Sequence, residues 1–175
     1  MRRMLLRRDP LADPEPLLRR VYAYVAFRIG HGPDAEDVTS DTLERALRYR
    51  RSYDASKGEP VAWLLGIARR CVDDFLAARR PVPLEPEEEA SAENLEEEAV
   101  ERLRVAAVVA GLDDRDRELI ALHYGADLAP RRIAEVLGLR PNAVEVALHR
   151  ARARLRARLE GDEADAVETP EAVSL

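Results

Sequence analysis

Apolar residues recur at intervals of three and four along most of the chain, and this spacing predicts helices. In the first half, three apolar stripes predict helices over residues 14–30, from about 34 to 51, and from about 60 to 80. In the second half, the same spacing predicts helices over about 99–111 and 114–124. No alternating strand pattern and no internal repeat interrupts the series. The expected fold class is therefore all-α.

The clearest local pattern lies over residues 127–159. A short helix is expected from Pro130 to Leu137, and a second helix restarts at Pro141, since proline is tolerated in a first helical turn. Gly138, between them, suits the left-handed conformation that ends many helices. A short helix, a glycine turn and a second helix are typical of the helix-turn-helix, whose second helix normally enters the DNA major groove.

That second helix carries five arginines at alternate positions, with no acidic residue among them. At helical pitch the arginines spread over the solvent side and leave the apolar stripe intact. One interpretation is a solvated helix surface, and the other is contact with nucleic-acid phosphates. The lack of neutralising carboxylates within the run favours phosphate contact. The five residues are Arg150, Arg152, Arg154, Arg156 and Arg158.

Charge is segregated along the chain, which has 28 basic and 34 acidic residues and a formal net charge of −6. Residues 1–80 and 105–160 are mildly basic, at +4 and +2. Residues 81–104 and 161–175 are acidic, at −7 and −5. Glu-rich strings with few large apolar residues do not bury enough surface to fold.

These patterns predict two small helical domains, over residues 1–80 and 99–160. A flexible acidic linker is expected at 81–98, and a disordered acidic tail at 161–175. A single cysteine excludes an internal disulfide framework, and no apolar run approaches the roughly 18 residues of a membrane span. The basic N-terminus, MRRMLLRR, has too short an apolar part for a secretory signal, so we expect a cytoplasmic protein. Since no catalytic motif or metal-ligand spacing is present, we also expect that it is not an enzyme and holds no cofactor or metal.

Segments in both halves carry a resemblance to one family. In the first half, Ala35–Ala46 reads AEDVTSDTLERA and Gly58–Leu76 reads GEPVAWLLGIARRCVDDFL. In the second half the matching segments are Leu112–Tyr124 and Ile133–Arg156. In this order, with an acidic stretch between them, they resemble regions 2 and 4 of the extracytoplasmic-function sigma factors. These are small two-domain sigma subunits of bacterial RNA polymerase, in the sigma-70 family.

The resemblance implies that the first domain is a three-helix bundle that docks on core RNA polymerase, at the clamp helices of the largest subunit. The implied docking residues lie on the second helix: Asp37, Ser40, Asp41 and Glu44. For the carboxylates, the alternative is an ordinary acidic helix start, which the helix dipole favours.

The resemblance also implies that the first domain recognises the −10 promoter element. The implied contacts lie on the third helix and the loop before it: Tyr53, Lys57, Trp63, Arg69 and Arg70. The loop would capture an unstacked base, which needs an aromatic or cationic surface. The alternatives are a plain surface loop, a core position for Trp63, and pairing of the arginines with Asp73 and Asp74 on the helix surface.

The second domain would hold the −35 element in the major groove. Its candidate contacts are Arg131, Arg132, Arg140, Asn142, Glu145, His149, Arg150 and Arg152. The chain departs from the family at Glu145, Val146 and Ala147, where Lys, Ser and Arg are frequent. Phosphate contacts fix position but carry no sequence information, so weak base reading is expected, with arginines supplying the affinity.

The predicted function is a sigma factor with core RNA polymerase and promoter DNA as partners, and the family allows an anti-sigma factor as a further partner. One alternative is a helix-turn-helix regulator that never joins polymerase, but it leaves Ala35–Ala46 unexplained. The other is a sigma-like interaction module that has lost promoter reading, which Glu145 and Ala147 keep open. Cys71, within an apolar stripe, is interpreted as a small buried hydrophobe rather than a redox sensor.

Overall fold

The computed structural model describes residues 9–79 and 97–167. These residues form seven α-helices and contain no strand, which confirms the predicted all-α class. The predicted linker at 81–98 lies outside the described residues except for its last two positions, where a helix has already begun. No helix in the described ranges combines the length and apolar character needed to cross a membrane.

The first half is a bundle of three helices, α1 (Pro14–Ile29), α2 (Pro33–Tyr49) and α3 (Pro60–Ala78). Each helix has a proline in its first turn, where a missing N–H group costs no hydrogen bond. A short 3-10 turn, η1 (Arg50–Ser52), leads from α2 into the loop before α3. The larger aliphatic residues that are fully buried in this bundle are Val21, Val25, Leu64, Leu65 and Val72.

The second half consists of α4 (Glu97–Ala110), α5 (Asp114–Ile120), α6 (Pro130–Leu137) and α7 (Pro141–Val167). A π-helical turn, η2 (Ala121–Gly125), follows α5 directly. The helix expected over 114–124 therefore changes geometry after its first seven residues.

The helix-turn-helix is confirmed. Gly138 ends α6 in the left-handed conformation, with φ 66°, and α7 begins at Pro141. Ile133 and Ala134 of α6 are buried, as are the apolar residues that face them from α7. Those residues of α7 are Val144, Leu148 and Ala151. This packing fixes the angle at which the N-terminal end of α7 projects.

The predicted disordered tail is partly wrong. Helix α7 continues through 161–167, whereas the tail was expected to begin at Gly161; residues 168–175 lie outside the described part. Extending an existing helix adds one hydrogen bond for each residue fixed, and the alanines and glutamate of this stretch have high helix propensity. Its acidic composition therefore does not stop the helix.

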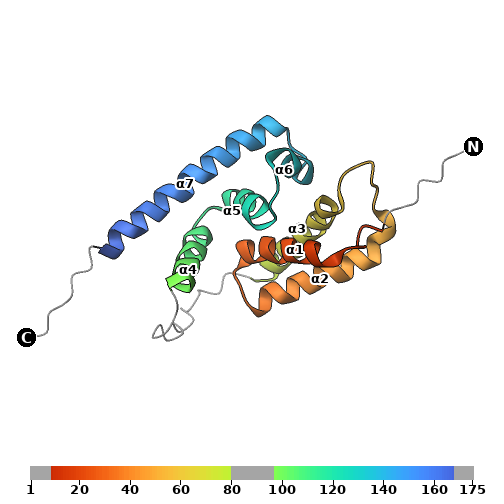
Figure 1. Ribbon diagram of the computed structural model, residues 1–175, viewed down its shortest axis with the longest axis horizontal. Coiled ribbons are helices and arrows are strands. Elements are labelled where there is room, and N and C mark those ends of the chain that lie inside the picture. Colours follow the sequence, from red (N-terminus) through yellow and green to blue (C-terminus); the bar gives the residue numbers. More distant parts are fainter. Residues whose placement is uncertain (1–8, 80–96, 168–175) are drawn as a thin grey trace, which may run out of the picture.

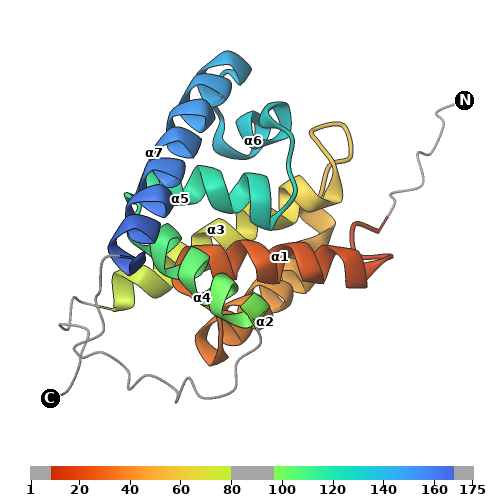
Figure 2. The same cartoon turned by 60° about the vertical axis from the view of Figure 1, so that its left-hand side comes forward.

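The two halves pack against each other. In Figures 1 and 2, α5 lies between α7 and the bundle of α1–α3, and the buried apolar residues form one continuous cluster. One close approach is at Gly125, where an added Cβ atom would lie 3.0 Å from the backbone oxygen of Ala23. A side chain there would require the neighbouring backbone to shift by a few tenths of an ångström, and the π-helical turn that ends at Gly125 packs against α1. We call this packed state the closed arrangement.

Candidate functional site

The exposed side of α2 is acidic. The four predicted docking residues, Asp37, Ser40, Asp41 and Glu44, are all exposed, while Val38 and Thr42 face the core. The helical repeat places the four on one surface, and the second half of the chain does not cover them. The structure thus brings the predicted set together, and its role in docking stays a prediction.

An apolar residue extends this acidic surface. Leu47, one turn beyond Glu44, is 56% exposed although it is apolar. A single exposed leucine is common on protein surfaces, so the acidic residues remain the distinguishing feature of this side of α2.

A cavity of about 500 Å³ lies between the C-terminal end of α2 and α3. Its lining combines aromatic rings with guanidinium groups, a composition suited to a flat nucleic-acid base and its phosphate. The lining residues are Arg45, Arg48, Tyr49, Ser52, Trp63, Ile67 and Arg70. Of the five predicted −10 contacts, Trp63 and Arg70 line this cavity.

The loop before α3 is anchored beside the cavity by Tyr53. The Tyr53 ring meets the Trp63 ring edge-on, at 5.7 Å between centroids, and its hydroxyl donates a hydrogen bond to the backbone oxygen of Gly58. Lys57, at the tip, is exposed. Tyr49, Arg45 and Arg48 were missed because no local pattern shows that the end of α2 meets α3.

Arg69 points to a different side of α3 from Arg70, since successive helical residues are about 100° apart. Its Nε group donates a 2.7 Å hydrogen bond to Glu118, and a second group reaches the backbone oxygen of Val136 at 3.4 Å. Arg69 is therefore engaged with the second half in the closed arrangement. Its predicted contact with DNA stays a prediction, and it requires the halves to separate.

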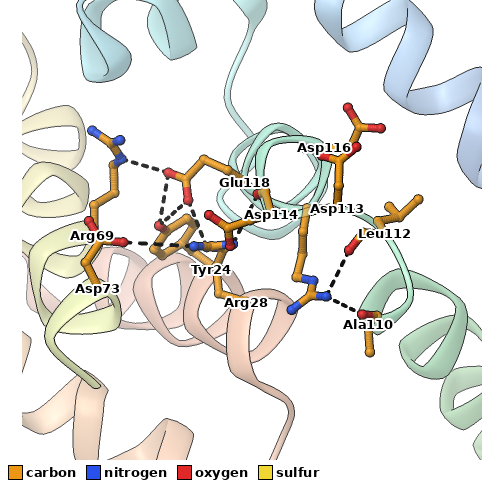
Figure 3. Close-up of polar contacts among 11 residues, drawn as sticks. Tyr24, Arg28, Arg69, Asp73, Ala110, Leu112, Asp113, Asp114, Asp116 and Glu118 are labelled. Atoms are coloured by element: carbon orange, nitrogen blue, oxygen red, sulfur yellow. Dashed lines mark hydrogen bonds and ion pairs between the residues drawn. The ribbon is translucent and has the colours of Figure 1, made fainter. Parts of the chain in front are cut away.

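Arg28 of α1 is the centre of a charged cluster between the two halves (Figure 3). Its side chain is only 1% exposed. One guanidinium nitrogen, Nη1, donates to Asp114 at 2.7 Å, and Asp73 is 4.0 Å from another. The Nε atom lies 2.8 Å from Glu118, close enough for an ion pair although its N–H is not directed at that oxygen.

Tyr24 completes the cluster. Its hydroxyl lies 3.0 and 3.1 Å from the two carboxylate oxygens of Glu118 and donates to them. Burial, together with the negative charge of Glu118, raises the pKa of Tyr24 well above its usual value of 10.0. Burial opposes the charge on Arg28, but the hydrogen bond to Asp114 and the charge of Glu118 outweigh it and raise the pKa of the guanidinium.

Sequence reasoning missed this cluster, although one signal was present. Arg28 follows Val21 and Val25 at helical spacing, so it stands on the apolar stripe of α1 rather than on its polar side. A cation on an apolar stripe indicates a buried charge that needs a partner. The identity of that partner, Glu118, depends on tertiary packing and has no local signature.

The helix-turn-helix presents a mixed surface at the start of α7. Asn142, Glu145 and His149 are exposed there. Three of the predicted phosphate contacts are exposed and make no ion pair or hydrogen bond within the described ranges; these are Arg131, Arg140 and Arg150. Arg132 instead pairs with Glu59 and Glu135, both at 2.7 Å.

Three arginines further along α7 contact other elements of the protein from its surface. Arg154 pairs with Asp116 of α5, whose side chain is 3% exposed, and Arg158 donates to the backbone oxygen of Gly111. Arg152 lies beside His123 and over the ring of Tyr124. The arginine run has no acidic neighbours in the sequence, but this did not mean that all its charges are free, because Asp116 of α5 neutralises Arg154.

Among the described residues, no cluster of three or more His, Cys, Asp or Glu side chains could hold a metal ion. Cys71 is buried, as predicted from its place in the apolar stripe.

Comparison with known proteins matches both halves to one family. The family model for sigma-70 region 2 matches residues 15–81, and the model for sigma-70 region 4 matches residues 102–155. A three-helix bundle followed by a helix-turn-helix domain, in this order, is the architecture of a sigma-70-type subunit of RNA polymerase.

Individual relatives narrow the assignment. The chain is 30% identical to the ECF RNA polymerase sigma factor SigK of Mycobacterium ulcerans (strain Agy99) over 146 residues, 78% of each protein. It is 32% identical over 152 residues to the ECF RNA polymerase sigma factor BldN of Streptomyces coelicolor, matching 82% of this chain but 57% of that longer protein. The chain belongs to the extracytoplasmic-function (ECF) sigma factors of the sigma-70 family. This confirms the predicted general function over the two alternatives.

Solved structures show the same fold. CnrH, determined in complex with the cytosolic domain of CnrY, is 29% identical, with a TM-score of 0.61 over 85% of this chain and 82% of that chain. The sigma factor RpoE from Bartonella quintana, determined with the anti-sigma factor NepR, is 20% identical and has a TM-score of 0.63. The second likeness concerns the fold alone.

Proposed function

We propose that this sigma factor docks on core RNA polymerase through the acidic surface of α2 and captures promoter bases in the adjoining cavity. The observation that carries the proposal is the position of α2, which contributes to both surfaces. Arg48 lines the cavity and donates a 2.6 Å hydrogen bond to Glu44 on the acidic surface. One helix thus joins polymerase docking to base capture.

The cavity suits an unstacked base of the −10 element. Trp63 and Tyr49 offer ring faces on which any base can stack, and each stacked base contributes about 1–3 kcal/mol. Arg70 is exposed at the cavity and supplies a cation for the adjoining phosphate. These contacts replace the stacking that a base loses when the duplex melts.

The helix-turn-helix is proposed to hold the −35 element mainly through phosphates. Arg131, Arg140 and Arg150 are available for such contacts, whereas Glu145 offers only an acceptor to base edges. We therefore expect the phosphate contacts to hold the domain firmly on the duplex, and the recognition helix to distinguish poorly between base sequences.

Binding both elements requires the closed arrangement to open. Positions −35 and −10 are about 25 base pairs apart, which is about 85 Å along B-DNA. In the closed arrangement Arg132 of α6 lies 2.7 Å from Glu59, in the loop of the first half. Polymerase docking leaves this contact untouched, because the acidic surface of α2 is exposed in the closed arrangement. Docking can therefore precede opening.

The chemistry of RNA synthesis belongs to the core enzyme in this proposal, and the sigma factor itself catalyses no reaction. It acts where the polymerase acts, in the bacterial cytoplasm. The likeness to CnrH, which was solved with the cytosolic domain of CnrY, supports a protein partner that controls this chain as well. An anti-sigma factor is the class of partner that we propose.

In vitro transcription tests the proposed function. Core RNA polymerase is mixed with this chain and genomic DNA, and transcript start sites are mapped. We expect a set of starts absent with core enzyme alone, and absent again when Asp37 and Asp41 are replaced by arginine. Unchanged start sites together with no co-purification of core polymerase would overturn the proposal.

A further inference from the structure

The cavity between α2 and α3 presents mainly hydrogen-bond donors to a base that enters it. Three of its lining side chains are arginines, Arg45, Arg48 and Arg70, and a guanidinium group donates but does not accept. No carboxylate or amide side chain of the described residues lines the cavity. Its side-chain acceptors are the hydroxyl oxygens of Ser52 and Tyr49. The lining therefore favours a base with acceptors on its accessible edge.

Arg45 is the lining arginine whose position is set by both helices. It belongs to α2, which lies beside α3 in Figures 1 and 2, and its Nη1 group donates a 2.8 Å hydrogen bond to Asp74 of α3. Its side chain is 37% exposed, against 63% for Arg48, whose partner Glu44 lies on the same helix. Asp74 therefore ties the Arg45 guanidinium to the opposite helix and limits its freedom at the cavity wall.

The pairing with Asp74 leaves one edge of the Arg45 guanidinium available. The bond to Asp74 uses Nη1, while the N–H groups of Nε and Nη2 have no partner within the described ranges. These two N–H groups point in parallel from one side of the planar group, and such a fork holds two adjacent acceptors at once. Guanine presents two adjacent acceptors, O6 and N7, on its major-groove edge, and their pairing with arginine is the commonest specific contact between proteins and DNA bases.

The other bases match this fork less well. Adenine places an amino group beside N7, so one N–H group of Arg45 would face another donor. Thymine carries a methyl group beside O4. Cytosine has two adjacent acceptors only on the edge that pairs with guanine, and its single ring covers less of the Trp63 and Tyr49 rings than a purine does.

We propose that the cavity selects guanine, with Arg45 as the residue that reads its O6 and N7 atoms and Asp74 as the residue that positions Arg45. This inference deepens the proposed function and rests on it, because a promoter base must enter the cavity. The guanine stacks on Trp63, whose ring is contacted edge-on by Tyr53. Arg70, which has no ion pair within the described ranges, stays available for the adjoining phosphate.

Trp63 is the only tryptophan of the chain, so its fluorescence reports directly on the cavity. No residue of the described second half lines the cavity, so the full chain is used without polymerase. It is titrated with short oligothymidylates that carry one central guanine, 7-deazaguanine, hypoxanthine, adenine or cytosine. We expect guanine to bind at least about fivefold more tightly than adenine, the lower limit for one bidentate contact. Hypoxanthine, which keeps O6 and N7, should retain this advantage, and 7-deazaguanine, which lacks N7, should lose it.

Two substitutions assign the preference to this pair of residues. Arg45→Lys keeps the charge but removes the planar fork, so it should abolish the guanine preference. Asp74→Asn frees the Arg45 guanidinium and should reduce the preference, while the fold persists because exposed ion pairs contribute little stability. Arg79 of α3 pairs with Asp34 of α2 in the same way but does not line the cavity. Arg79→Lys and Asp34→Asn are therefore the matched controls and should leave the preference unchanged. Circular dichroism checks each fold, and the base analogues test the unmodified chain.

The inference is overturned if guanine and 7-deazaguanine bind alike, or if Arg45→Lys keeps the preference. Tightest binding of cytosine also overturns it, and would assign the cavity to the pairing edge of a pyrimidine. Equal affinity for every oligonucleotide overturns this inference and leaves base capture standing. A Trp63 fluorescence that no oligonucleotide changes overturns base capture as well. The transcription assay tests polymerase docking separately, because polymerase is absent from these titrations.

Discussion

The Nε atom of Arg28 lies 2.8 Å from a carboxylate oxygen of Glu118, and this ion pair joins the two halves of the sigma factor. Both charges are removed from water, with the side chains 1% and 12% exposed. A buried ion pair repays its desolvation only in part, so its main effect is on which arrangement forms. A separated or misaligned arrangement that leaves Arg28 buried without Glu118 is strongly disfavoured.

Removing one member of this pair should destabilise the protein more than removing both. Arg28→Met removes one of the two cations that pair with Glu118 and leaves Arg69 as the other, and it should lower the free energy of unfolding by about 3 kcal/mol. The double variant Arg28→Met with Glu118→Leu should recover most of that loss. Urea denaturation followed by circular dichroism measures each value, with Arg19→Met as the matched control. Additive effects of the two substitutions would show that the pair is not coupled.

The raised pKa of Tyr24 predicts a stability that declines in alkali. In the unfolded chain the phenol ionises near pH 10, while in the folded protein it stays protonated to higher pH. The free energy of unfolding should then fall as pH rises above 10, by at most about 1.4 kcal/mol per pH unit for this group. Tyr24→Phe should remove that part of the slope, measured by denaturation between pH 9 and 11. An unchanged slope would contradict the contact with Glu118.

Charge reversal on α2 should weaken core polymerase binding without unfolding the chain. Asp37→Arg with Asp41→Arg places two cations on the exposed acidic surface, and we expect at least a tenfold loss of affinity, about 1.4 kcal/mol. The matched control reverses Glu15 and Glu36, which are also exposed in the first turns of their helices. Equal losses in the two chains would indicate a general charge effect rather than a docking surface.

Tyr49 should contribute to base capture although sequence reasoning did not select it. It lines the cavity and is 54% exposed, so Tyr49→Ala should cost little stability. Loss of one stacking surface should weaken holoenzyme binding to a single-stranded −10 oligonucleotide by about 1–3 kcal/mol, roughly 5- to 150-fold. Tyr124→Ala is the control, because Tyr124 is 53% exposed but lies in the second half. A similar effect of both substitutions would argue against the cavity.

Two arginines of α7 should differ in their effect on DNA binding. Arg150 is exposed without a partner in the described ranges, so Arg150→Gln should lower the dependence of log affinity on log salt by about one unit. Arg154 pairs with buried Asp116, so Arg154→Gln should reduce stability and leave the salt dependence unchanged. Holoenzyme affinity for one promoter across a salt series measures both. The reverse result would place Arg154, and not Arg150, at the phosphates.

Local chemistry explains which features could be predicted from sequence. The helix-turn-helix depends on Pro130, Gly138 and Pro141, whose backbone preferences act within a few residues, and its first helix, its turn and the start of its second helix were predicted correctly. The ion pairs, in contrast, could not be predicted from the local sequence. Arg154 stands in a run without acidic neighbours, yet Asp116 pairs with it from a separate helix. Pairing across helices is set by packing and leaves no trace in the local pattern.

The same limit applies to the sites. The acidic surface of α2 was predicted because all its residues lie on one helix. The cavity was found only in part, since Tyr49 and Trp63 come from different helices and meet through tertiary contacts. The π-helical turn after Ile120 likewise accompanies the close approach of Gly125 to Ala23. The spacing of apolar residues along the sequence does not predict such a contact.

The attachment of Glu118 to the same chain as its binding site has a quantitative consequence for any competitor. A ligand tethered in this way meets its site at an effective concentration on the order of millimolar. A free helix of equal intrinsic affinity, present at about micromolar concentration, would occupy the site about a thousandfold less often. A free helix therefore does not displace Glu118 through affinity alone, and in the proposed function the two halves separate because polymerase and promoter act on both of them.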